Sequence, residues 1–178
     1  MQSKHTVGIA DMKVSAVPED LIITYALGSC LGITVYDPVV RVGGMLHAML
    51  PTCSTDPEKA QKNPFMFVDT GVPQLFLASY KLGAKKERLI VKVAGGACMN
   101  KAEAEDQFQI GKRNFLMLRK LLWKNGVLIK AEEVGGQLAR TLLLSPGGRR
   151  RPYQIQWGGK YALKRRSNDH GFQCFSRG

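Results

Sequence analysis

The segment from residue 21 to residue 50 constrains the fold most, because it reads as three strands in close succession. Residues 21–24 are mostly β-branched, and residues 31–36 alternate large apolar side chains with small or polar ones, the period-two pattern of a strand. A turn at Asp37-Pro38 separates the second strand from a third at residues 45–50. Two strands joined by a short turn pair side by side, so the sequence predicts a β-sheet here.

Two helical patterns and several further strand patterns surround this segment. One helix is predicted from an N-cap at Asp69 or Thr70 to Gly83, with Pro73 in its first turn, and another over residues 110–125. Further strand patterns lie at residues 6–10, 89–93, 127–131, 139–144 and 153–157. Roughly eight strands and two long helices without strict alternation predict an α+β fold, a single-domain sandwich of β-sheets with both helices packed on one face.

Length and composition bound the class of protein. The 178 residues fit one domain, and 44% hydrophobic with 22% charged residues is the composition of a globular chain. No apolar run of 18 residues occurs, so we expect no membrane insertion. The polar start has no signal-peptide core, which favours a cytoplasmic protein. The four cysteines form no close pair, so we expect free thiols and no metal site.

The net charge of +12 is concentrated near the C-terminus. Residues 148–178 hold eight basic residues and a single acid, and therefore contribute +7 of that charge. We expect a domain core at residues 1–147, followed at residues 148–178 by a last strand and a flexible basic extension. This tail is either solvated or attracted to an acidic receptor or an anionic membrane. It contains no recognisable nucleic-acid-reading module, so nucleic acid is not an expected partner.

Cys30 and His47 are the residues with the clearest chemical potential. Cys30 follows Gly28 and Ser29, small residues that permit a tight turn and leave room around the sulfur. His47 lies on the third strand of the segment, beside the strand that Cys30 begins. A thiol becomes a nucleophile when a neighbouring imidazole takes its proton, and the Thr24 hydroxyl can orient that imidazole. A buried small cysteine and a structural histidine are the alternative at this stage.

Several short blocks that contain these residues occur in a recognisable order. They are Leu27-Gly28-Ser29-Cys30, Tyr36-Asp37-Pro38, Gly43-Gly44-Met45-Leu46-His47 with Leu50-Pro51, Ala94-Gly95-Gly96-Ala97-Cys98-Met99, Ile110-Gly111-Lys112-Arg113-Asn114, and Gly135-Gly136 followed by Arg140. In this order and spacing, over about residues 6 to 158, the chain resembles the CheD-type chemoreceptor glutamine deamidases. The glycine-containing blocks after residue 94 are interpreted as turns and helix packing that support the site.

The resemblance implies a function and roles for the residues. Cys30 matches the nucleophile of the family, His47 its base and Thr24 the residue that positions the imidazole. The implied reaction is deamidation of glutamines on methyl-accepting chemotaxis receptors, through a thioester and without a cofactor. Gly28 and Ser29 are the expected substrate-binding and oxyanion positions. The implied partners are the receptor and a CheC-type phosphatase, and an adaptor that mainly regulates this phosphatase is the alternative function.

Overall fold

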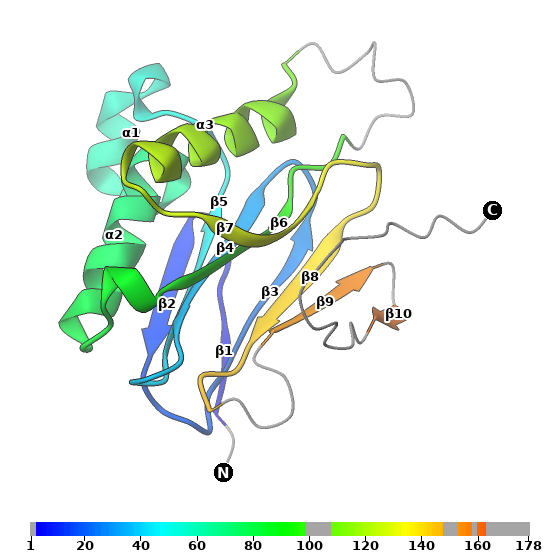
Figure 1. Ribbon diagram of the computed structural model, residues 1–178. Coiled ribbons are helices and arrows are strands. Elements are labelled where there is room, and N and C mark those ends of the chain that lie inside the picture. Colours follow the sequence, from blue (N-terminus) through cyan, green and yellow to red (C-terminus); the bar gives the residue numbers. More distant parts are fainter. Residues whose placement is uncertain (1–2, 99–107, 148–152, 158–159, 163–178) are drawn as a thin grey trace.

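The protein is built from three layers, with helices on one side and two β-sheets behind them (Figure 1). The computed structural model describes residues 3–98, 108–147, 153–157 and 160–162. The sheet next to the helices, here the central sheet, has the order β2 (Asp11–Ser15), β5 (Val42–Ala48), β4 (Leu31–Asp37), β6 (Ile90–Gly95) and β7 (Ile129–Val134). Its strands pair antiparallel except for β6 and β7, which are parallel.

The second sheet, here the outer sheet, also has five strands. Their order is β1 (Lys4–Thr6), β3 (Leu21–Leu27), β8 (Arg140–Leu144), β9 (Tyr153–Trp157) and β10 (Lys160–Ala162). Only β1 and β3 are parallel neighbours. The two sheets face each other across a cluster of buried side chains that includes Leu27, Met45 and Leu142.

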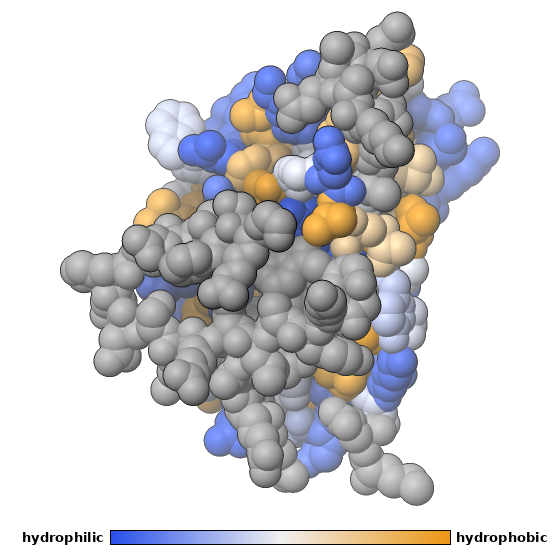
Figure 2. All heavy atoms as spheres, turned by 90° about the vertical axis from the view of Figure 1, so that its right-hand side faces the viewer, coloured by the Kyte–Doolittle hydropathy of each residue, from blue (hydrophilic) through white to orange (hydrophobic). Residues whose placement is uncertain are grey.

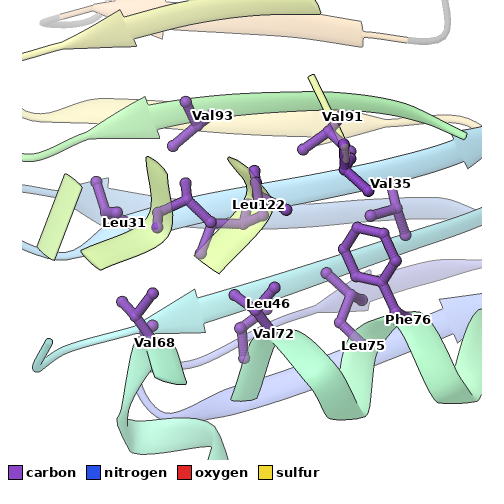
Figure 3. Close-up of a cluster of buried hydrophobic side chains, with 14 residues drawn as sticks. Leu31, Val35, Leu46, Val68, Val72, Leu75, Phe76, Val91, Val93 and Leu122 are labelled. Carbon is purple, nitrogen blue, oxygen red and sulfur yellow. The ribbon is translucent and has the colours of Figure 1, made fainter. Parts of the chain in front are cut away.

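Both long helices lie on the same face of the central sheet, as the sequence predicts. They are α2 (Val68–Lys81) and α3 (Ile110–Lys124). The 3-10 turn η1 (Cys53–Thr55), the short helix α1 (Pro57–Lys62) and the 3-10 turn η2 (Pro64–Met66) lie between β5 and α2, and the 3-10 turn η3 (Lys86–Arg88) lies between α2 and β6. Figure 3 shows their apolar side chains against β4, β5 and β6, with Val72 and Leu75 of α2 facing Leu46. The α+β sandwich is therefore confirmed.

Several local predictions differ from the structure. Residues 6–10 are not a strand, because β1 ends at Thr6, Ala10 takes a positive φ, and the next strand begins at Asp11. Helix α2 begins at Val68, so neither Asp69 nor Thr70 is its N-cap, and Pro73 lies beyond the first turn. The Asp69 carboxylate instead accepts hydrogen bonds from Thr52 and Cys53, and the Thr70 hydroxyl donates to Pro64. Tertiary contacts thus outweigh the local capping signal.

The surface on the outer-sheet side mixes residue types. Figure 2 shows this side, and its coloured parts carry both hydrophobic and hydrophilic residues, as is usual for a surface in contact with water. The predicted boundary after residue 147 stays a prediction, because residues 148–152, 158–159 and 163–178 lie outside the described residues. Among the helices of the described part, none is long and apolar enough to cross a membrane.

Candidate active site

A bulge at the end of β3 shapes the chain that leads to Cys30. The pairing of β3 with β8 shifts register between Thr24 and Leu27, and Ala26 takes the left-handed conformation with φ +53°. A non-glycine residue in this conformation costs about 1 kcal/mol, and bulges of this kind often lie beside active sites. The chain then bends through Gly28 and reaches Cys30 just before β4. The bulge therefore redirects the chain between the two candidate residues Thr24 and Cys30.

Thr24 and His47 meet in the interior between the two sheets. Both side chains are buried, and the Thr24 Oγ1 lies 2.8 Å from the His47 Nδ1. The same hydroxyl donates its single hydrogen to the backbone carbonyl of Val7, also at 2.8 Å. Because this hydrogen is used, Oγ1 accepts from the imidazole, and His47 carries its ring proton on Nδ1. The predicted contact between Thr24 and His47 is therefore present in the structure, and it fixes the tautomer.

The other ring nitrogen of His47 has the properties of a base. With the proton on Nδ1, Nε2 holds a free electron pair, and this buried atom has no hydrogen-bond partner among the described residues. Burial lowers the pKa of His47 below its ordinary value, although the Asp11 carboxylate, opposite it on β2, opposes this effect. A lowered pKa keeps the imidazole neutral, which is the form that accepts a proton.

Cys30 immediately precedes β4, the strand that pairs with β5, and β5 carries His47. Gly32 of β4 stands directly opposite His47, and Cys30, two residues earlier, falls on the same side of the strand. The side chain is half-buried and packs against the inter-sheet cluster. Burial raises the pKa of its thiol, while its own backbone N–H lowers it. The two pKa shifts favour a neutral thiol on Cys30 and a neutral imidazole on His47. No hydrogen bond joins the Cys30 sulfur to the His47 Nε2.

Glycines hold the Cys30 loop against β6. The carbonyl of Cys30 accepts a hydrogen bond from Gly96, and the carbonyl of Gly28 accepts one from Ala97. A Cβ on Gly95 would lie 2.1 Å from the Cys30 oxygen, so this contact requires a glycine. The supporting role predicted for these glycines is consistent with these contacts. The N–H of Gly28, in contrast, is bound to the carbonyl of Ala26, which leaves Ser29 and Cys30 as the candidate oxyanion donors.

A hollow of about 320 Å³ lies beside this loop and reaches the start of α3. Gly96 connects it to Cys30, and its wall includes Cys98. None of the three described cysteines, Cys30, Cys53 and Cys98, forms a disulfide. Burial and the nearby Asp69 carboxylate raise the pKa of Cys53, so this thiol is less reactive than an ordinary one. No cluster of metal-binding side chains occurs among the described residues.

Sequence reasoning missed two groups at the site. The Val7 carbonyl fixes the Thr24 hydroxyl, and a backbone atom leaves no signal in the sequence. Asn114 belongs to a block interpreted as scaffold, yet its side chain donates to the carbonyls of Ser29 and Met49. The signal available in the sequence was the position of Asn114 as a polar residue within the Ile110-Gly111-Lys112-Arg113-Asn114 block.

The fold and this site define a class of protein, an α+β sandwich with a buried threonine–histidine pair between its two sheets and a half-buried cysteine just before the strand that pairs with that of the histidine. Comparison with known proteins makes the class more specific. Residues 49–150 match the family model described as CheD chemotactic sensory transduction. The chain belongs to the CheD family, which confirms the relationship predicted from the sequence blocks.

The relatives are similar over most of their length. A probable chemoreceptor glutamine deamidase CheD of Solibacter usitatus is 50% identical over 144 residues, which cover 81% of this chain and 84% of that protein. A protein of the same description from Syntrophus aciditrophicus is 51% identical over 138 residues, which cover 78% and 85%. One from Pyrococcus abyssi is 44% identical over 138 residues, which cover 78% and 83%.

Proposed function

We propose that this protein is a glutamine deamidase of chemoreceptors that uses Cys30 as its nucleophile and His47 as its base. Its family and the names of its relatives support the substrate and the reaction. The Nδ1–H tautomer of His47 supports the mechanism most directly, because it leaves Nε2 free to take a proton. The reaction replaces the side-chain amide of a receptor glutamine by a carboxylate and releases ammonia.

The first half of the mechanism forms a thioester. As the substrate carboxamide approaches, the Cys30 thiol gives its proton to Nε2 of His47, and the sulfur attacks the amide carbon. The carbon becomes tetrahedral and its oxygen carries a negative charge. The imidazolium then protonates the amide nitrogen, the carbon–nitrogen bond breaks, and ammonia leaves with the Cys30 thioester behind.

The second half restores the enzyme. Nε2 takes a proton from water, and the resulting hydroxide attacks the thioester carbon. When the carbon–sulfur bond breaks, the sulfur regains a proton from the imidazolium and a glutamate side chain is released. The backbone N–H groups of Ser29 and Cys30 are the proposed donors to the oxyanion in both halves. No metal or organic cofactor takes part in these steps.

The experiment uses purified protein and receptor cytoplasmic fragments. Wild-type protein is expected to release ammonia and to add about one dalton at each modified glutamine, whereas Cys30→Ala does neither. Cys53→Ala is the matched control, because it removes another half-buried thiol outside the site. Ammonia release by Cys30→Ala at the wild-type rate would contradict the assignment of the nucleophile.

We also propose that the protein acts in the cytoplasm and binds a CheC-type phosphatase. The resemblance to the family supports this partner, and the described part of the chain contains no helix able to span a membrane. Binding of the phosphatase by a protein that lacks detectable deamidase activity would favour the adaptor function instead.

A further inference from the structure

Asn114 is a buried polar residue of the site region that the mechanism above does not use. It lies on the inner face of α3 with no exposed surface. The two hydrogens of its Nδ2 are donated to the carbonyls of Ser29 and Met49, each at 3.0 Å. The flipped amide would place Oδ1 against both carbonyl oxygens, so the orientation of the side chain is fixed.

The two carbonyls belong to the chain segments that carry the nucleophile and the base. The ladder between β4 and β5 ends with Leu31 opposite Ala48, and the next residues along are Cys30 and Met49. There the strands turn to other partners, because the Cys30 carbonyl binds Gly96 and the Met49 amide binds Met66. The amide of Asn114 therefore bridges the two strand ends where their own pairing stops.

The bond to Ser29 also sets the direction of the Cys30 amide. The Ser29 carbonyl and the Cys30 N–H belong to one planar trans peptide and point in opposite directions. Since Asn114 holds the carbonyl toward α3, the N–H points away from the helix, where it interacts with the sulfur of Cys30. A hydrogen bond to the carbonyl also polarises the N–H of the same peptide.

This arrangement is costly for stability. With both hydrogens donated, the buried Oδ1 of Asn114 has no hydrogen-bond partner among the described residues. A buried acceptor without a partner is destabilising, and this cost offsets part of what the two donated hydrogen bonds contribute to stability. The side chain is therefore better explained by what its two donors hold in place.

We propose that Asn114 is a positioning residue that aims the Cys30 N–H at the developing oxyanion and sets the spacing between the ends of β4 and β5. The proposal rests on the proposed function, because it assumes that Cys30 is the nucleophile. Asn114 acts through the peptide that it holds and does not touch the substrate.

The test compares Asn114→Asp and Asn114→Ser with Asn125→Asp in the full-length chain. Asparagine 125 is the matched control, because its Nδ2 donates to the Leu121 carbonyl at the exposed end of the same helix. We expect kcat on receptor fragments to fall about 10- to 100-fold in both Asn114 variants, with KM within about twofold of wild type, because a misdirected oxyanion donor weakens transition-state binding. The control is expected to keep its kcat within about twofold.

A second readout separates positioning from stability. The rate at which iodoacetamide alkylates Cys30 is followed against pH by mass spectrometry of the Cys30 peptide. Since the Cys30 N–H lowers the pKa of its own thiol, the alkylation midpoint is expected to move to higher pH in the Asn114 variants and to stay in place in the control.

Each outcome decides the proposal. An unchanged kcat per folded enzyme, an unchanged alkylation midpoint, or loss of the fold in both Asn114 variants would overturn it. Deamidation by Cys30→Ala at the wild-type rate would instead remove the proposed function, and the alkylation profile would still report whether Asn114 orients the Cys30 amide.

Discussion

Replacement of Thr24 by valine tests the orientation of the base. Valine has nearly the shape of threonine but lacks the hydroxyl that bridges the Val7 carbonyl and the His47 Nδ1–H. Both of these groups would remain buried without a partner. Each such loss costs about 1–3 kcal/mol, so the free energy of unfolding is expected to fall by about 2–6 kcal/mol in Thr24→Val.

The same change is expected to slow catalysis. Without its acceptor, the proton is no longer held on Nδ1, and fewer His47 rings keep Nε2 free. Loss of the charged aspartate in serine proteases costs ~10⁴-fold in kcat. The neutral hydroxyl of Thr24 contributes less, and we expect a loss of about 10- to 100-fold. Thr24→Ser keeps the hydroxyl and serves as the control.

Three measurements check this prediction: ammonia release from receptor fragments, urea unfolding, and ¹⁵N NMR of the His47 ring. In wild type and Thr24→Ser the proton is expected on Nδ1, and in Thr24→Val the ring is expected to populate the other tautomer. A Thr24→Val enzyme with kcat within twofold of Thr24→Ser, or with the proton still on Nδ1, would refute the role of Thr24.

Three further perturbations probe other parts of the structure. Gly95→Ala is expected to lower the melting temperature and ammonia release far more than Gly83→Ala, because both glycines have a positive φ but only Gly95 faces the Cys30 carbonyl; equal effects would contradict this. Arg88→Ala is expected to lower the free energy of unfolding by about 2–4 kcal/mol, because it leaves the buried Asp37 carboxylate without its ion pair. A change below about 1 kcal/mol in urea unfolding would count against this role of Arg88. Burial lowers the pKa of His47, so kcat/KM is expected to stay constant as the pH is lowered to 6.5, the ordinary pKa of histidine, and to fall only at lower pH. A loss of kcat/KM that begins above pH 6.5 would disprove a neutral base.

The same shift in His47 carries a consequence for stability. The folded protein holds the imidazole neutral at pH values where the unfolded chain binds a proton. Through this group, the free energy of unfolding therefore does not change with pH above the ordinary pKa of histidine, and it decreases as the pH falls from there toward the lower pKa of the folded state. Acid therefore weakens both the fold and the base through one group.

Periodic patterns of apolar residues and chemically distinctive side chains could be recognised in the sequence. Alternation over residues 31–36 and the turn at Asp37-Pro38 predicted the hairpin that brings Cys30 and His47 to neighbouring strands. Local signals failed where the tertiary structure uses the same side chain differently. Asp69 is a good N-cap in isolation, but in the fold its carboxylate binds the backbone of Cys53.

Backbone groups and long-range polar contacts could not be derived in this way. The tautomer of His47 depends on the Val7 carbonyl, which any residue at position 7 would provide. The bond from Asn114 to Ser29 joins residues 85 positions apart and requires the packing of α3 to be known. The sequence therefore identifies the chemical groups of the site, whereas the fold decides which of their atoms are free.

Burial gives this site a resting state that differs from a preformed thiolate and imidazolium pair. It raises the pKa of Cys30 and lowers that of His47, so both shifts oppose separation of charge in the free enzyme. A thiol in the protonated form reacts slowly with oxidants and alkylating agents. In the proposed mechanism, we therefore expect the proton to move when a bound amide lets the backbone donors stabilise negative charge, which would couple reactivity to the presence of substrate.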